Sequence, residues 1–114
     1  MRRETEKSLV HRAKEISNKN IPAIILFGVS HNKDELGTDS LKPDGLLARM
    51  IKTTKDASPK TLVTADICLC EYTDHGHCGP LNKKGQPDND RTLEIIAKQA
   101  VNACEAGADI IAPS

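Results

Sequence analysis

The sequence predicts an α/β fold in which three parallel strands alternate with three helices. Short apolar runs with the length and composition of buried strands lie within residues 23–28, 61–66 and 109–112. Helical apolar periodicity precedes each run, over residues 4–18, 44–56 and 90–106. Strands that alternate with helices pair in parallel through right-handed crossovers, and ligands bind at the carboxyl ends of such strands. We expect one domain, residues 1–114.

The first helix is expected over residues 4–18. Its apolar residues Leu9, Ala13 and Ile16 recur at intervals of four and three, and Pro22 prevents the helix from continuing. The run that follows, residues 23–28, is almost entirely apolar, which is typical of a parallel strand buried on both faces.

A long polar loop connects this strand to the second helix. Residues 30–44 are expected to lack regular structure, and loops of this length are often functional, so His31 is a candidate site residue. Helix 44–56 ends before Pro59, and strand 61–66 follows. The inner face of this helix is expected to consist of Leu46, Leu47, Met50, Ile51 and Thr54.

The third helix, residues 90–106, has the clearest periodicity. A single apolar stripe contains Leu93, Ile96, Ala97, Ala100, Val101 and Cys104. Because Cys104 falls on that stripe, it is expected to pack in the core. Gly107 can adopt the left-handed conformation that ends a helix, and strand 109–112 follows.

A cysteine-rich loop, residues 67–79, follows the second strand. Cys68 and Cys70 are two residues apart, so they point to the same side of an extended chain. Asp66 lies two residues before Cys68, so its side chain is expected on the same side of the extended chain. The sequence therefore places a carboxylate and two thiols together at the carboxyl end of this strand.

Cys78 can join the other two cysteines because glycines lie close to it on either side. Gly76 and Gly79 tolerate the backbone angles that fold a short loop back on itself. Three converging thiolates suit zinc far better than magnesium or calcium, and three ligands leave the open position of a catalytic zinc site. Two alternatives stay open, a redox pair and inert thiols, although a redox pair normally has the spacing C-x-x-C rather than C-x-C.

Composition argues against several classes of function. The formal net charge is zero and only 2% of the residues are aromatic, so a nucleic-acid interface is not expected. No apolar run approaches the roughly 18 residues of a membrane span, and no signal peptide is recognisable. We therefore expect a cytoplasmic protein with no membrane partner, in a reducing compartment where clustered thiols bind metal more often than they form disulfides.

Three segments of the chain together form a specific pattern. The most specific is Asp66-Ile-Cys-Leu-Cys70 followed by His75-Gly-His-Cys-Gly79. The second is residues 21–28 followed by Lys33-Asp-Glu35 and Gly37, and the third is residues 106–114. In this order they resemble the metal-binding segment, the first barrel strand with its loop, and the third strand of the porphobilinogen synthase family, also called delta-aminolevulinic acid dehydratase. The resemblance covers nearly the whole chain.

The resemblance implies a fold and an activity. The fold would be the N-terminal part of a TIM barrel, with about three of its eight βα units. The activity would be that of a hydro-lyase that condenses two molecules of 5-aminolevulinate to porphobilinogen in tetrapyrrole (heme) biosynthesis. Members of the family assemble into large homo-oligomers, so self-association is implied as well.

The resemblance also implies roles for individual residues. The residues that match the three zinc ligands are Cys68, Cys70 and Cys78. Zinc held there would act as a Lewis acid on substrate and bound water. Asp66 matches a carboxylate that contacts the substrate, and Ser114 matches a serine that lines the substrate site. His77 matches a histidine that lies beside the zinc without binding it, whereas the roles of His31 and His75 stay open.

The family's two catalytic lysines, which form Schiff bases with the substrate, match no position of this sequence. None of its eleven lysines lies within an expected strand, so these residues are expected to be inactive without a C-terminal half. Two other functions stay open: a stand-alone zinc-binding module, and a fragment that modulates the assembly of a complete enzyme. An open three-stranded sheet exposes an edge and apolar surface, so we also expect self-association.

Overall fold

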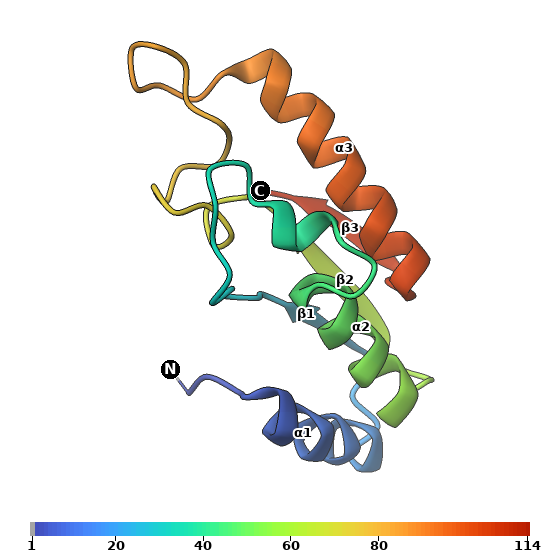
Figure 1. Ribbon diagram of the computed structural model, residues 1–114. Helices are drawn as coiled ribbons and strands as arrows, with labels where there is room; N and C mark the ends of the chain where they lie inside the picture. The colour runs from blue at the N-terminus through green and yellow to red at the C-terminus, as the bar shows by residue number, and fades with distance from the viewer. Residues whose placement is uncertain (1) are drawn as a thin grey trace.

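The computed structural model describes residues 2–114 and contains one parallel sheet with helices (Figure 1). Its elements, in order, are α1 (Glu6–Asn18), β1 (Ala23–Leu26), the short 3₁₀ helix η1 (Thr38–Leu41), α2 (Leu46–Ala57), β2 (Leu62–Ile67), α3 (Asn89–Ala106) and β3 (Ile110–Pro113). The strand order is β1-β2-β3, and both pairs are parallel. The predicted α/β fold, its three strands and its three main helices are confirmed.

The core lies between the sheet and the layer formed by α2 and α3. Both helices contact β2, and α3 also runs along β3 (Figure 1). Alternate residues of β2 point into this layer and are fully buried, as are facing residues of the two helices: Leu47, Ile51, Val63, Ala65, Ile67 and Ala103. The predicted inner face of α2 is confirmed, except that Leu46 is only partly buried.

Helix α1 packs against α2 rather than on the sheet. It begins later than predicted because Thr5 and Ser8 cap it reciprocally: each side-chain oxygen accepts a hydrogen bond from the other residue's backbone N–H, at 2.8 and 3.1 Å. Among residues 2–114, no helix combines the length and apolar character that crossing a bilayer requires.

Strand β1 is not buried on both faces, so that expectation is wrong. Ile24 and Leu26 pack against the core, whereas Ile25 is 48% exposed and Phe27, directly after the strand, is 64% exposed. The reason is that α2 and α3 cover only one face of the sheet. Within residues 2–114 no second layer covers the other face.

Helix α3 turns a different face inward from the one predicted. Its buried residues are Gln99, Asn102, Ala103 and Ala106. In contrast, Leu93 and Val101 are 60% and 56% exposed, and Cys104 is exposed rather than packed in the core. Two alanines allow close approach, and two amides form hydrogen bonds to buried backbone carbonyls. A hydropathy pattern places polar residues such as Gln99 and Asn102 on the solvent-exposed side of a helix. The apolar periodicity therefore predicted the wrong buried face for α3.

The loop expected over residues 30–44 is partly structured and partly buried. It contains η1, whose Asp39 and Ser40 are buried. The Ser30 hydroxyl donates to the Asp39 carboxylate at 2.7 Å. The same loop lies beside the cysteine loop, because the Ser30 N–H donates to the Glu71 carbonyl at 3.1 Å. The start of this loop, at Ser30, therefore contacts the cysteine loop directly.

Candidate metal centre

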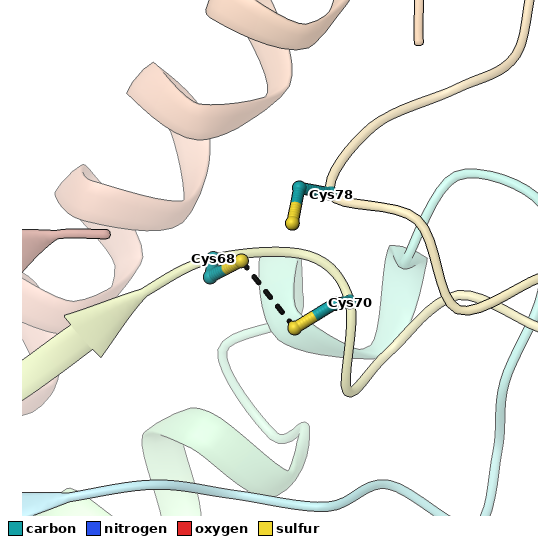
Figure 2. A group of neighbouring side chains, drawn as sticks. All are labelled: Cys68, Cys70 and Cys78. Atoms are coloured by element: carbon teal, nitrogen blue, oxygen red, sulfur yellow. Dashed lines mark hydrogen bonds between the residues drawn. The ribbon is translucent and has the colours of Figure 1, made fainter. Parts of the chain in front are cut away.

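Three cysteine sulfurs converge at the carboxyl end of β2. Cys68 directly follows the last strand residue, Cys70 lies in the bend after it, and Cys78 returns from the far side of the loop (Figure 2). The three Sγ atoms all lie within 4.8 Å of one another. Cys68 and Cys70 are closest, with 3.5 Å between their sulfurs. The predicted convergence of the thiols is therefore present in the structure.

The loop returns to its starting point through local hydrogen bonds. The backbone N–H groups of Tyr72 and Thr73 both donate to the Leu69 carbonyl at 2.9 Å, which closes a tight turn. Gly76 has a φ of +76°, a conformation that favours glycine. The Thr73 hydroxyl then donates to the His77 carbonyl at 2.8 Å and positions the residue before Cys78.

Helix α3 supports both ends of the cysteine loop. The side-chain amide of Gln99 donates to the Cys68 carbonyl at 2.9 Å. At the other end, Gly79 lies so close to Thr92 that an added Cβ would collide with the threonine side chain. Neither Gln99 nor Thr92 was identified from the sequence, where a polar residue on a helix is normally assigned to solvent.

The three thiols differ in burial and in pKa. Cys68 is buried, Cys70 is partly buried and Cys78 is exposed. Burial raises the pKa of the Cys68 thiol, but hydrogen bonds from the Cys70 N–H and from the Cys78 and Cys70 thiols outweigh it, and the net shift is downward. Burial and the neighbouring Cys68 sulfur raise the pKa of Cys70 to about 12. The pKa of Cys78 is also raised, first by its hydrogen bond to Cys68.

This donor set fits a thiophilic cation. Three sulfurs that share one small region would repel one another as thiolates. A cation at their centre would reverse that repulsion. Soft sulfur ligands favour zinc over magnesium or calcium. All four cysteines of the chain are free thiols in the structure, so the three-cysteine cluster can hold a metal ion.

Asp66 and Ser114 meet at the same end of the sheet. The Ser114 hydroxyl donates to the Asp66 carboxylate at 2.6 Å, and the Ser114 N–H donates to the Ile67 carbonyl at 3.2 Å. The two residues lie at the carboxyl ends of neighbouring strands, because Asp66 is the penultimate residue of β2 and Ser114 directly follows β3. A carboxylate and a hydroxyl thus lie beside the cysteine loop, and their roles toward a substrate remain predictions.

The histidines lie outside the sulfur cluster. His77 is exposed, and its backbone N–H donates to His75 Nδ1 at 3.1 Å. The two rings lie 5.5 Å apart between centroids, and His75 Nε2 is 3.1 Å from the Glu35 carbonyl oxygen. His31 is exposed as well. The expected place of His77 beside a bound metal remains a prediction.

The fold and the cluster together define a segment of a parallel α/β barrel with a three-cysteine cluster, able to hold a metal ion, at the carboxyl end of its sheet. The model of one protein family, delta-aminolevulinic acid dehydratase, matches residues 1–114. The chain belongs to this family.

Curated proteins similar to this chain are described as delta-aminolevulinic acid dehydratases. The chain is 50% identical over 109 residues to the dehydratase of Escherichia coli, covering 96% of this chain and 33% of the relative. It is 47% identical over 100 residues to that of Bacillus subtilis, covering 88% and 31%. The chain therefore spans about a third of the length of the curated relatives it matches.

A solved structure has the same fold. It is the crystal structure of delta-aminolevulinic acid dehydratase (porphobilinogen synthase) from Toxoplasma gondii, in complex with the reaction product porphobilinogen. The TM-score is 0.89 at 35% identity, over 98% of this chain and 33% of that one. The three βα units described here are thus the N-terminal part of a porphobilinogen synthase barrel, as the sequence predicted.

Proposed function

We propose that these residues supply the zinc centre and one wall of the substrate site of a porphobilinogen synthase, which condenses two molecules of 5-aminolevulinate to porphobilinogen for heme biosynthesis. The observation that carries the proposal is the convergence of three Sγ atoms within 4.8 Å beside the Asp66–Ser114 pair. Membership of the family supports the identity of the reaction.

The chain's own residues have distinct parts in this proposal. Cys68, Cys70 and Cys78 hold zinc and leave one position open; when bound, the ion supplies Lewis-acid chemistry. Asp66 accepts a proton or a hydrogen bond from the substrate amine. Ser114 orients that carboxylate through the 2.6 Å bond and lines the substrate site. His77 lies beside the zinc and does not bind it.

Residues 1–114 act together with the remaining two thirds of the barrel in this proposal. Condensation through Schiff bases requires a lysine amine near the substrate. None of β1, β2 and β3, the strands of the described residues, contains a lysine. We therefore propose that these residues alone do not form porphobilinogen, and that the complete enzyme works in the cytoplasm.

A chimera tests the function. These residues would replace the matching part of the Escherichia coli relative, to which they are 50% identical. We expect the chimera to form porphobilinogen from 5-aminolevulinate, and Cys78→Ser to lower the rate by about 100-fold or more, because a three-ligand site cannot spare a ligand. Cys104→Ser, which alters an exposed cysteine on α3, is the matched control and should keep the activity.

Two outcomes would contradict the proposal. One is a folded chimera that binds zinc but forms no product. The other is full activity of the Cys78→Ser chimera. Tight zinc binding by the 114 residues with an inactive chimera would favour the alternative, a stand-alone zinc-binding module, which the closeness of all three sulfurs within one loop also supports.

A further inference from the structure

The side chain of Gln99 is fully buried and contacts the metal loop directly. Its Nε2 donates to the Cys68 carbonyl oxygen at 2.9 Å, across 31 residues of sequence. A carbonyl oxygen can only accept, so the amide nitrogen must face Cys68. Gln99 lies in the middle of α3, whose first turn meets Gly79 at the other end of the loop.

The bond lies where the strand ends and the loop begins. On the side of β2 that faces β3, the last backbone hydrogen bond runs from the Ser114 N–H to the Ile67 carbonyl. The next carbonyl, that of Cys68, takes the Gln99 amide instead of a strand neighbour. Because a peptide group is planar, fixing this carbonyl also fixes the direction in which the chain leaves toward Cys70. The Gln99 bond therefore lies at the peptide group that connects Cys68 to the turn containing Cys70.

Stability alone does not account for this glutamine. Its Oε1 is buried and has no hydrogen-bond donor among residues 2–114. A buried amide that makes half of its bonds contributes little to folding, because its unpaired oxygen loses the solvation it had in water. Methionine has nearly the same length and would fill the same space with no unpaired atom of its own, but it would leave the Cys68 carbonyl without this donor. The bond to Cys68 is the contribution that methionine would not reproduce.

We propose that Gln99 is a positioning residue of the three-cysteine centre. It holds the peptide group after Cys68 so that the Cys68 sulfur stays within reach of those of Cys70 and Cys78. This inference rests on the metal site proposed above and assigns that site a support on α3.

The test compares the metal affinity of the wild-type chain with that of variants in which one buried side-chain amide, of Gln99 or of Asn102, is replaced. The probe is Co²⁺, followed through the thiolate-to-cobalt charge-transfer absorption of the reduced 114-residue chain, with Zn²⁺ affinity measured by competition. Gln99→Met and Gln99→Glu both remove the donor that faces Cys68. We expect Co²⁺ and Zn²⁺ to bind about 10- to 100-fold more weakly to each, as is usual when a residue that orients a ligand is replaced.

Asn102→Leu is the matched control. Asn102 lies one turn further along the same buried face, and its amide donates to the Ser40 and Lys42 carbonyls at 2.8 and 3.1 Å, away from the cysteine loop. This variant should lower the urea midpoint and leave the Co²⁺ affinity unchanged. Circular dichroism and the urea midpoint identify the conditions under which each variant is folded.

The outcomes separate the two proposals. Wild-type affinity in a folded Gln99→Met or Gln99→Glu variant would overturn the role of Gln99 and leave the metal site intact. Equal losses in Gln99→Met and Asn102→Leu would also overturn it, since general loosening would then be the cause. A wild-type chain that binds neither ion would overturn the metal site itself.

Discussion

Gly79 allows the cysteine loop to approach α3 closely. A methyl group at this position would collide with the Thr92 hydroxyl and come within 2.8 Å of its Cγ2 atom. Thr92 has little freedom to move, because its hydroxyl also donates to the Asp88 carbonyl at 2.6 Å. The position next to Cys78 therefore requires glycine for space.

We predict that Gly79→Ala destabilises the chain by about 1–3 kcal/mol, the usual effect of overpacking, and weakens Co²⁺ binding because Cys78 is displaced. Gly85→Ala is the control: Gly85 has a φ of +75° and no atom near its added Cβ, so the variant is strained but lies outside the cysteine loop. Urea unfolding and cobalt titration measure both effects. Equal metal affinity in the two variants would argue against a tight contact at Gly79.

The residues of the site divide into those that the sequence could identify and those that it could not. Strand parity predicted that Asp66, Cys68 and Cys70 share one side, and the three sulfurs do converge. Gln99 could not be identified in this way, since its function depends on a backbone carbonyl 31 residues away. Side chains that bond to distant backbone leave no periodic signal in a sequence.

At the scale of elements, a polar contact joins α2 to the start of β3. Asp109 accepts hydrogen bonds at 2.9 Å from both the Val63 N–H and the Lys55 ammonium group. These two donors lower the pKa of the Asp109 carboxyl. The contact lies at the amino ends of the strands, opposite the cysteine loop, so it concerns stability and not the site.

This contact predicts a pH dependence. A carboxylate whose pKa is lower in the folded chain stabilises the fold above its unfolded pKa of about 3.9, and the contribution is lost as the pH falls through the folded value. Wild type should exceed Asp109→Asn in unfolding free energy by about 1 kcal/mol or less at pH 7. The difference should shrink as the pH falls below about 4. Urea unfolding at several pH values measures it.

Asp56→Asn is the control for this prediction, because Asp56 is an exposed carboxylate next to Lys55 in the sequence. It should have no comparable pH-dependent effect. A difference between wild type and Asp109→Asn that persists unchanged at pH 3 would show that the charge of Asp109 is irrelevant.

The order of the elements followed directly from sequence, whereas the orientation of α3 did not. Apolar runs and helix-ending residues such as Gly107, which has a φ of +112°, identify elements one at a time. The face that a helix buries depends on its neighbours. Here Ala103 and Asn102 face inward, while Leu93 and Val101 face outward.

In the whole molecule, one face of the sheet is largely apolar, and no other part of residues 2–114 covers it. It includes Ile25, Leu62 and Ile110, which are 48%, 47% and 43% exposed, together with Phe27 after β1. Ile25 and Ile110 both lie opposite Thr64 in the register, so they form one continuous surface. A closed barrel would bury this face as its interior.

We predict that the 114-residue chain self-associates through this face, as large exposed apolar surfaces commonly do. Light scattering at micromolar concentration should give a mass above 12.4 kDa that falls in the Ile25→Lys/Ile110→Lys variant. Leu93→Lys, which alters an exposed residue of α3, is the control and should leave the mass unchanged. A single monomeric wild-type species would contradict the prediction.

The zinc content of the purified, reduced chain shows whether Cys68, Cys70 and Cys78 form a metal centre. We predict about one zinc ion per chain in wild type and in Cys104→Ser, because Cys104 lies outside the cluster. Both Cys68→Ser and Cys78→Ser should lose the ion. A folded wild-type chain that holds no zinc, with all four thiols reacting freely, would show that the loop does not form the metal centre on which the proposed function depends.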